Sequence, residues 1–240
     1  MKGQGSALGP FPCLTPHPWP FTMRPRVVLF DLDNTLYPPE CGLLQHLDDR
    51  INDFVSGCLG LSLEETKALR RRYSQQYGTT LHGLQAEHGL PPAEYLSAVH
   101  DGVPIEQFLN RDEQLLAALA AIEIEKVVFT NAPREYARRV MQCLGLDSHF
   151  RVVIDLEFHD YAGKPFREAY ERVVAHLKVR PEECVLVEDT LRNLRAAKEL
   201  GMTTVLVGAE AAASDYVDFT VARPAEVTAL LARLLDQPPA

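Results

Sequence analysis

The sequence predicts an α/β fold in which a doubly wound parallel sheet carries an inserted α-helical domain. Short β-branched apolar runs alternate along the chain with stretches whose apolar residues recur every three or four positions. Such alternation is typical of a parallel sheet with helices on both faces. A long segment without a strand pattern follows the first run, which indicates an insertion at the end of the first strand. The composition, 46% hydrophobic and 24% charged, is that of an ordinary globular protein.

The first strand is predicted over 26–31, where the run Arg-Val-Val-Leu-Phe-Asp is short and apolar and ends on an acid. Runs of this kind suit strands that are buried on both faces of a sheet. Further strands are expected on the same pattern at 126–130, 184–188, 203–207 and, more weakly, 152–155. Helical periodicity between them predicts helices around 137–144, ended by Gly145, and around 166–177.

The segment between the first and second strands is expected to be helical throughout. Apolar spacing predicts an amphipathic helix over 43–58, and Ser62 with Glu65 forms a capping box that opens a second helix. Further helical turns are expected over 80–88 and 92–99. An insertion placed directly after an acid-bearing strand would fold over the carboxyl end of the sheet, where doubly wound folds bind ligands.

The predicted elements divide the chain into three parts. We predict a helical cap domain over 40–110 and a core formed by 25–39 and 111–240. Residues 1–24 precede both and are rich in proline, without the apolar centre of a signal peptide. We expect this leader to be extended and mobile, and Met23 to be a candidate start of translation.

Several classes of protein are disfavoured by composition. The formal net charge of −9 argues against a partner that is a nucleic-acid polymer. The longest apolar run, 115–122, is too short to span a membrane. Five cysteines without Cys-x-x-Cys spacing indicate neither a disulfide framework nor a zinc site, so a cytoplasmic location is expected.

Acidic residues follow two of the predicted strands. Asp31 and Asp33 stand one residue apart after the first, and Glu188 and Asp189 end another. Each pair alone would also suit a turn or a helix cap. If the two strands are neighbours, four carboxylates meet at one edge, and like charges near 4 Å repel by about 4 kcal/mol at an effective dielectric of 20. A hard cation such as Mg²⁺ would relieve this repulsion.

Two more positions have residue types that suit an anion. Thr130 and Asn131 end a third strand, where backbone N–H groups and polar side chains meet the next helix. Lys164 opens the helix predicted at 166–177, an unusual place for a cation because the helix dipole disfavours positive charge there. A helix cap and a surface lysine are the alternative explanations.

Taken together, Asp31-x-Asp33-x-Thr35, Thr130, Lys164 and Glu188-Asp189 resemble, in order and spacing, the motifs of the haloacid dehalogenase superfamily of phosphotransferases. The resemblance covers residues 26 to about 222. It implies a Rossmann-like core, with a helical cap between the first and second motifs.

The resemblance implies a role for each core residue. Asp31 would be the nucleophile that forms an aspartyl phosphate, and Asp33 would act as general acid and then as general base. Thr130 and Asn131 would hold phosphate oxygens, while Lys164 would offset their charge.

The same resemblance implies a Mg²⁺ cofactor. Its ligands would be Asp31, the Asp33 carbonyl and Asp189, with Glu188 binding through water. Asn193 fits the fourth motif and would brace its loop.

Within the superfamily, 35–38, 77–84 and 99–104 resemble the pyrimidine 5′-nucleotidase group. That resemblance implies that Tyr73 or Tyr77 stacks on a base. Contacts to the nucleoside would come from Thr79, from His82 or from an arginine of 70–72. Helix packing for the tyrosines and a solvated face for the arginines are the alternatives.

The leading hypothesis is therefore a Mg²⁺-dependent phosphomonoesterase for pyrimidine nucleoside 5′-monophosphates. The alternatives are a phosphatase for a sugar phosphate or pyridoxal phosphate, a phosphomutase, or a catalytically silent binding protein on the same fold. Because a binding protein needs neither nucleophile nor acid, the pair Asp31 and Asp33 favours an enzyme. The expected partner is a small phosphorylated substrate, and the oligomeric state stays open.

Overall fold

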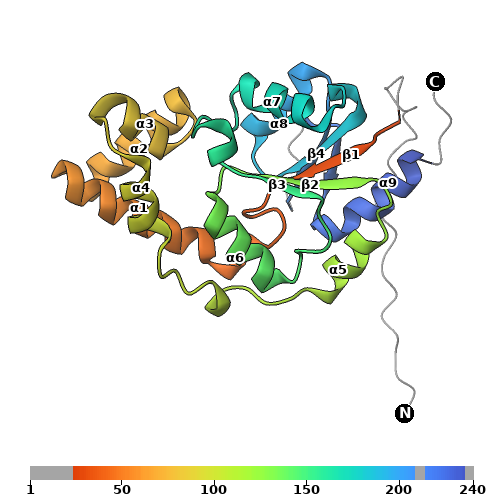
Figure 1. Cartoon of the computed structure of the whole chain (residues 1–240), viewed down its shortest axis with the longest axis horizontal. Helices are drawn as coiled ribbons and strands as arrows, with labels where there is room; N and C mark the ends of the chain where they lie inside the picture. Colours follow the sequence, from red (N-terminus) through yellow and green to blue (C-terminus); the bar gives the residue numbers. More distant parts are fainter. Residues whose placement is uncertain (1–23, 209–213, 236–240) are drawn as a thin grey trace, which may run out of the picture.

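A computed structural model describes residues 24–208 and 214–235 (Figure 1). The expected start at Met23 and all of the predicted leader except Arg24 therefore lie outside the described residues. Within the described ranges one six-stranded sheet forms, and all its strand pairs are parallel. The strand order is β3-β2-β1-β4-β5-β6. The strands are β1 (Val27–Phe30), β2 (Glu125–Phe129), β3 (Val152–Ile154), β4 (Cys184–Glu188), β5 (Thr203–Val207) and β6 (Phe219–Val221).

The helices fall into two groups along the chain. Between β1 and β2 lie α1 (Leu43–Leu59), α2 (Leu63–Tyr77), α3 (Thr80–His88), α4 (Pro92–His100) and α5 (Glu113–Ala120). After β2 come α6 (Arg134–Leu144), α7 (Arg167–Leu177), α8 (Leu191–Leu200) and α9 (Val227–Leu235). Helices α1 to α4 lie together beside the sheet, and we call them the cap helices (Figure 1). The exact limits of a cap domain stay a prediction.

Strand β1 runs through the middle of the core and is buried on both faces. Val28 and Phe30 belong to a hydrophobic cluster that includes residues of α5, α6 and α9. Val27 and Leu29 belong to a second cluster, together with residues of α7 and α8. Successive side chains of a strand point to opposite faces, so a strand with helices on both sides needs an uninterrupted apolar run. The doubly wound fold is confirmed.

The neighbours of β1 place three strand ends side by side. Phe30 is in register with Val128 of β2 and with Val187 of β4. The backbone N–H of Asp31 donates to the carbonyl of Val187, at 2.9 Å, and continues this pairing beyond the strand. The residues that follow β1, β2 and β4 therefore lie at one edge of the sheet, as the sequence predicts.

Local sequence signals explain where the cap helices begin and end. Ser62 and Glu65 form the expected capping box at the start of α2. Thr79 caps α3 by accepting from the backbone N–H of His82, and Gly89 ends that helix in the left-handed conformation. The expectation of helix throughout is wrong for 101–112, where only a single 3-10 turn forms. Gly102, at φ +69°, and the following Pro104 account for this interruption.

Two strands also differ from the prediction, one in its limits and one in its existence. Strand β2 begins and ends one residue earlier than predicted, which leaves Thr130 beyond the strand. Strand β6 was not predicted, because its three residues, Phe219–Val221, give too short a pattern. Among the described residues, no helix combines the length and the apolar character that crossing a membrane requires.

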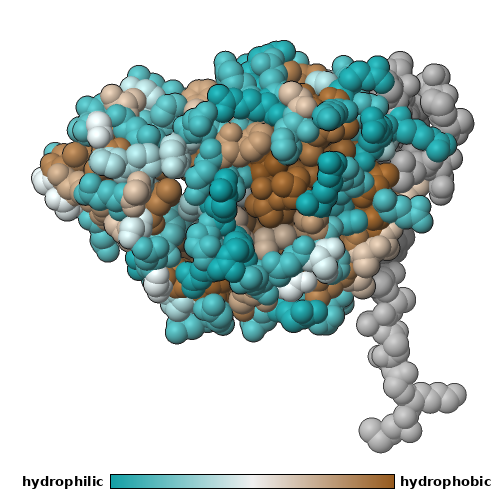
Figure 2. All heavy atoms as spheres, in the orientation of Figure 1, coloured by the Kyte–Doolittle hydropathy of each residue, from teal (hydrophilic) through white to brown (hydrophobic). Residues whose placement is uncertain are grey.

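The edge of the sheet at β3 carries a groove of ≈ 340 Å³ with apolar residues in its floor. Figure 2 shows apolar side chains gathered over this edge, with hydrophilic ones around them. Arg134, Arg138 and Arg151 line the groove. Each of them is paired with a carboxylate: Asp155, Glu135 and Glu125, respectively. The groove thus has no excess positive charge.

The contact of α2 with α3 depends on Gly83, where an added Cβ would lie 2.2 Å from the Tyr73 ring. We predict that Gly83→Ala lowers the free energy of unfolding by about 1–3 kcal/mol through overpacking. The matched control is Gly57→Ala in α1, because a Cβ there meets nothing within 4 Å. That substitution should be neutral or stabilising by about 0.5–1 kcal/mol. Urea denaturation would measure both, and equal effects would contradict the prediction.

Candidate active site

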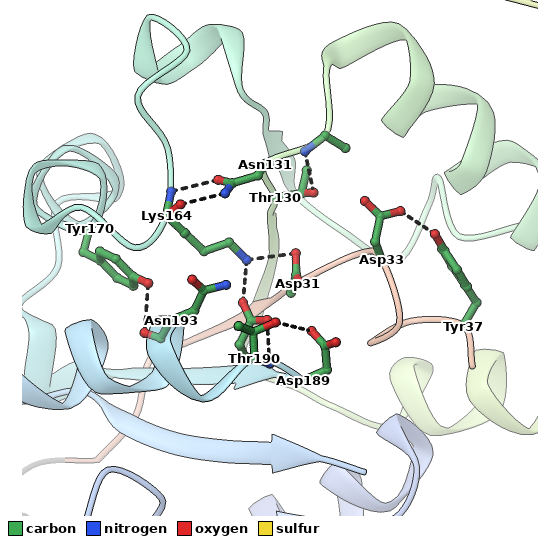
Figure 3. A network of polar contacts seen from close by, with 12 residues as sticks. Asp31, Asp33, Tyr37, Thr130, Asn131, Lys164, Tyr170, Asp189, Thr190 and Asn193 are labelled. Atoms are coloured by element: carbon green, nitrogen blue, oxygen red, sulfur yellow. Dashed lines mark hydrogen bonds and ion pairs between the residues drawn. The ribbon is translucent and has the colours of Figure 1, made fainter. Parts of the chain in front are cut away.

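The centre of the site is the buried side chain of Lys164. Its Nζ lies 2.8 Å from Asp31 Oδ1 and 2.6 Å from Glu188 Oε2 (Figure 3). It also lies over the ring of Phe129, 5.1 Å from the centroid. Lys164 is therefore not a surface lysine, and it comes to the site from the loop before α7 because that loop runs along the carboxyl edge of the sheet.

The protonation of this cluster follows from burial and from charge. Burial and the neighbouring charge of Glu188 raise the pKa of Asp31 well above its usual range. Burial lowers the pKa of Lys164, but the carboxylates of Asp31 and Glu188 outweigh it, so that pKa is raised overall. Burial and Glu188 also raise the pKa of Asp189, to about 7. The carboxylates thus outnumber the one cation that lies among them.

Three of these acids could together hold a cation. Asp31, Glu188 and Asp189 each offer an oxygen, and these oxygens lie within 4.8 Å of one another. Carboxylate oxygens in a buried cluster with excess negative charge are a donor set that suits Mg²⁺. Glu188 Oε1 also accepts from the backbone N–H of Thr190, at 3.1 Å. The residues present therefore fit the metal implied by the sequence.

The second acid, Asp33, is held by tyrosines. Its Oδ1 accepts from the hydroxyl of Tyr37 and, at 3.0 Å, from that of Tyr136. Burial raises the pKa of Asp33, and the two hydroxyls act in the opposite direction. No described residue bonds Oδ2. Tyr136 is a site residue that sequence reasoning missed, because no local pattern links it to Asp33.

Thr130 and Asn131 have different roles. The Thr130 hydroxyl accepts from the backbone N–H of Ala132, at 3.0 Å, so its own hydrogen can point toward a ligand. The Asn131 amide instead binds the backbone of Lys164 twice, with Nδ2 donating to its carbonyl at 2.7 Å and Oδ1 accepting from its N–H at 2.8 Å. Both polar atoms of the Asn131 side chain thus position Lys164, and the phosphate-binding role expected of Asn131 stays a prediction.

A pocket of ≈ 160 Å³ opens beside Asp33, between the core and the cap helices. Most of its lining is apolar, and polar atoms come from few residues. Its lining residues are Asp33, Leu44, Leu47, Ile51, Thr79, Leu81, Tyr95, Leu96, His100, Asn131, Ala132, Pro133, Tyr136 and Leu156. The structure thus brings the predicted acid and one predicted cap residue, Thr79, to the same pocket.

The other predicted cap residues do not line this pocket. Tyr73 is fully buried against Gly83, and its hydroxyl contacts Glu87 and His88, so it cannot stack on a base. Tyr77 donates to Glu87, at 3.1 Å. The His82 ring packs edge-on against Phe166 and Tyr77.

The arginine run 70–72 is also used within the cap. Arg70 binds Asp48 and Asn52, and Arg72 forms a two-point ion pair with Glu87. These contacts favour a structural role over the nucleoside contact considered for the run.

The cap and the core also meet directly at Arg192. Its guanidinium donates to the carbonyl of Ser74 at 2.9 Å, to the Ser74 hydroxyl at 2.6 Å and to the carbonyl of Gly78 at 3.4 Å. Arg192 stands three residues after Asp189, in the first turn of α8. The next residue, Asn193, accepts at its carbonyl from the Tyr170 hydroxyl, at 2.9 Å, which ties this turn to α7.

The bond pair between Asn131 and Lys164 depends on Gly163, where an added Cβ would lie 2.1 Å from Asn131 Oδ1. We predict that Gly163→Ala lowers the free energy of unfolding by about 1–3 kcal/mol. In an Asn131→Ala background the same substitution should cost much less, because its clash partner is gone. A double-mutant cycle by urea denaturation measures this coupling. Additive costs would show that Gly163 does not act through Asn131.

Comparison with known proteins supports the same fold. N-acetylmuramic acid 6-phosphate phosphatase of Pseudomonas aeruginosa is 28% identical over 208 residues, which are 77% of this chain and 82% of that protein. Phosphate metabolism protein 8 of Saccharomyces cerevisiae is 23% identical over 75% of this chain, which spans 61% of the length of that relative. A solved HAD phosphatase from Thermococcus onnurineus shares the fold, with a TM-score of 0.58 over 91% of this chain and 100% of that chain, at 22% identity.

The family model of the haloacid dehalogenase-like hydrolases matches residues 25–201. This range runs from β1 to the end of α8. It includes each strand end and loop that carries Asp31, Asp33, Thr130, Lys164 or Asp189. The chain therefore belongs to the haloacid dehalogenase-like hydrolases.

Proposed function

We propose that this protein is a Mg²⁺-dependent phosphomonoesterase that works through an aspartyl-phosphate intermediate. The observation that carries the proposal is the position of Asp33, a second carboxyl beside the pocket whose Oδ2 is left for proton transfer. An alkoxide leaves poorly without a positioned acid, whereas expulsion of a halide needs none. A relative named as a phosphatase, the Pseudomonas aeruginosa protein, agrees with this choice.

Two displacements at phosphorus make up the reaction. In the first, an oxygen of Asp31 bonds to phosphorus while the bond to the leaving oxygen breaks, and that oxygen takes the proton of Asp33. In the second, water attacks the aspartyl phosphate and gives a proton to Asp33, while the bond between Asp31 and phosphorus breaks. Dividing one hard displacement into two is the advantage of a carboxylate nucleophile.

The phosphoryl group would be bound by side chains that have an unused hydrogen-bond donor. Lys164 has three N–H donors, of which Asp31 and Glu188 use two. The Thr130 hydroxyl accepts a backbone hydrogen bond and keeps its own hydrogen to donate. The oxygens of Asp31, Glu188 and Asp189 would hold Mg²⁺, whose charge offsets that of the phosphoryl group.

For the leaving group we propose a pyrimidine nucleoside. The pocket beside Asp33 is mostly apolar, which suits the face of a flat base better than a sugar with many hydroxyls. His100 supplies one polar contact. Its Nδ1 lies 3.2 Å from the carbonyl of Leu96, which can only accept, so Nδ1 carries the hydrogen. Burial lowers the pKa of His100 to about 4, so the ring is neutral and Nε2 is an acceptor for an N–H of the base.

Pyridoxal phosphate is the second candidate substrate, because the same apolar walls would accept its ring. A substrate panel separates the two.

The first prediction from this proposal concerns metal and nucleophile. Phosphate release should be fastest with UMP and CMP among a panel that also contains AMP, sugar phosphates and pyridoxal phosphate. Chelation of Mg²⁺ should abolish it. Asp31→Asn should lower turnover by at least about 10³-fold, since no covalent intermediate can then form. Turnover that survives the chelator, or an Asp31→Asn variant with full activity, would contradict the mechanism.

The second prediction concerns His100. His100→Phe keeps an aromatic ring but removes the acceptor, and should raise KM for UMP by about 5–10-fold, the value of one hydrogen bond. His100→Gln retains an acceptor and should restore part of the affinity. A small substrate without a base, such as p-nitrophenyl phosphate, provides the control. Equal KM increases for both substrates would show that His100 does not contact the base.

A further inference from the structure

One oxygen of Asp33 is bonded by two buried tyrosines. Oδ1 accepts from Tyr37 and from Tyr136, the latter at 3.0 Å, and the two hydroxyl oxygens lie 3.2 Å apart. Both tyrosines are 2% exposed. The two tyrosine hydroxyls are shielded from water and so have few other hydrogen-bond partners. They therefore hold the Asp33 carboxyl group in one orientation.

We propose that Tyr37 and Tyr136 are positioning residues for proton transfer by Asp33. The inference rests on the proposed function, since it assumes that Asp33 gives a proton to the leaving oxygen. Two donors on Oδ1 leave Oδ2 to carry the proton, and no described residue competes for Oδ2. Figure 3 shows the Asp33 carboxyl turned to Tyr37 on one side, with its other oxygen directed away from that hydroxyl.

The two tyrosines reach Asp33 from independent parts of the fold. Tyr37 follows it in the same loop, which is tightened by a hydrogen bond from the Leu36 N–H to the Leu32 carbonyl, at 2.9 Å. Tyr136 belongs to α6 and its ring packs on His100 of α4, with centroids 5.3 Å apart. Because a local and a remote element restrain the same oxygen, the carboxyl group cannot rotate without breaking at least one of the two bonds.

In the first displacement, the proton of Asp33 is needed when the leaving group is an alkoxide. The bond from Asp31 to phosphorus forms, the bond to the leaving oxygen breaks, and the hydrogen on Asp33 Oδ2 is transferred to that oxygen. A p-nitrophenolate leaves as a stable anion and does not need this proton. Loss of positioning should therefore slow the cleavage of alkyl phosphates more than that of p-nitrophenyl phosphate.

The test compares Tyr37→Phe, Tyr136→Phe and the double variant with the wild type. Release of the leaving group in the first turnover is measured with UMP and with p-nitrophenyl phosphate, because later steps are common to both. General acid catalysis is worth about 10²–10⁴-fold, so each variant should lose about 10–100-fold with UMP. It should lose less than about 3-fold with p-nitrophenyl phosphate, and KM should stay nearly unchanged.

Tyr73→Phe is the matched control, since it removes another buried hydroxyl bonded to a carboxylate, that of Glu87 in the cap. It should leave the ratio of the two first-turnover rates unchanged. An equal loss on both substrates in the Tyr37 and Tyr136 variants, or no loss on either, would overturn the positioning role.

Asp33→Asn separates this inference from the proposed function. If Asp33→Asn slows UMP selectively but the tyrosine variants do not, only the positioning role fails. If Asp33→Asn affects both substrates equally, the acid role of Asp33 fails, and the proposed function with it. Melting temperatures of all variants check that the conservative changes leave the fold intact.

Discussion

The burial of the Lys164 ammonium between Asp31 and Glu188 is the constraint on which the rest of the site depends. Removing a charge from water costs several kcal/mol, and the cost is recovered only if the partners are held in good geometry. Here β1 and β4 must be adjacent so that the two carboxylates converge. The lysine loop must also be fixed, which the two bonds from Asn131 accomplish.

The same cluster leaves more negative charge than one lysine can compensate. Burial chiefly, and the nearby charge of Glu188 in addition, raise the pKa values of Asp31 and Asp189. In a protein with a formal net charge of −9, the attraction of an anionic substrate has to come from local cations and not from the overall field. The buried Lys164 meets part of that requirement, and a divalent ion held by Asp31, Glu188 and Asp189 would meet the rest.

Much of this architecture could be predicted from the sequence, because parallel strands put their carboxyl ends at one edge. That rule was enough to predict that Asp31 and Asp33 lie near Glu188 and Asp189, whereas Lys164 was assigned to the site through the family resemblance. The roles of residues whose partners lie elsewhere in the fold were harder to predict. Asn131 follows a strand as a phosphate-binding residue would, yet its amide is used by a backbone 33 positions away.

The helices of the cap could be predicted from the sequence, but the contacts between those helices could not. Capping residues and periodicity specify where a helix begins and which stripe is apolar, but they do not say which neighbour covers that stripe. Tyr73 and Tyr77, four positions apart, look alike in sequence, whereas the close approach of Gly83 buries only Tyr73 completely. The sequence assigned no individual role to Tyr136 or to His100, although His100 lies in the segment 99–104, because their contact joins α6 to α4.

The contact made by Arg192 has a consequence for the timing of turnover. Its guanidinium binds the carboxyl-terminal end of α2, while its backbone belongs to the turn that follows Asp189. Any hinge motion that lifts the cap helices must break these bonds and pull on that turn. Under the proposed function, departure of the product and relaxation of the loop that carries Asp189 would thereby be linked, so that a closed cap and an ordered loop form one unit.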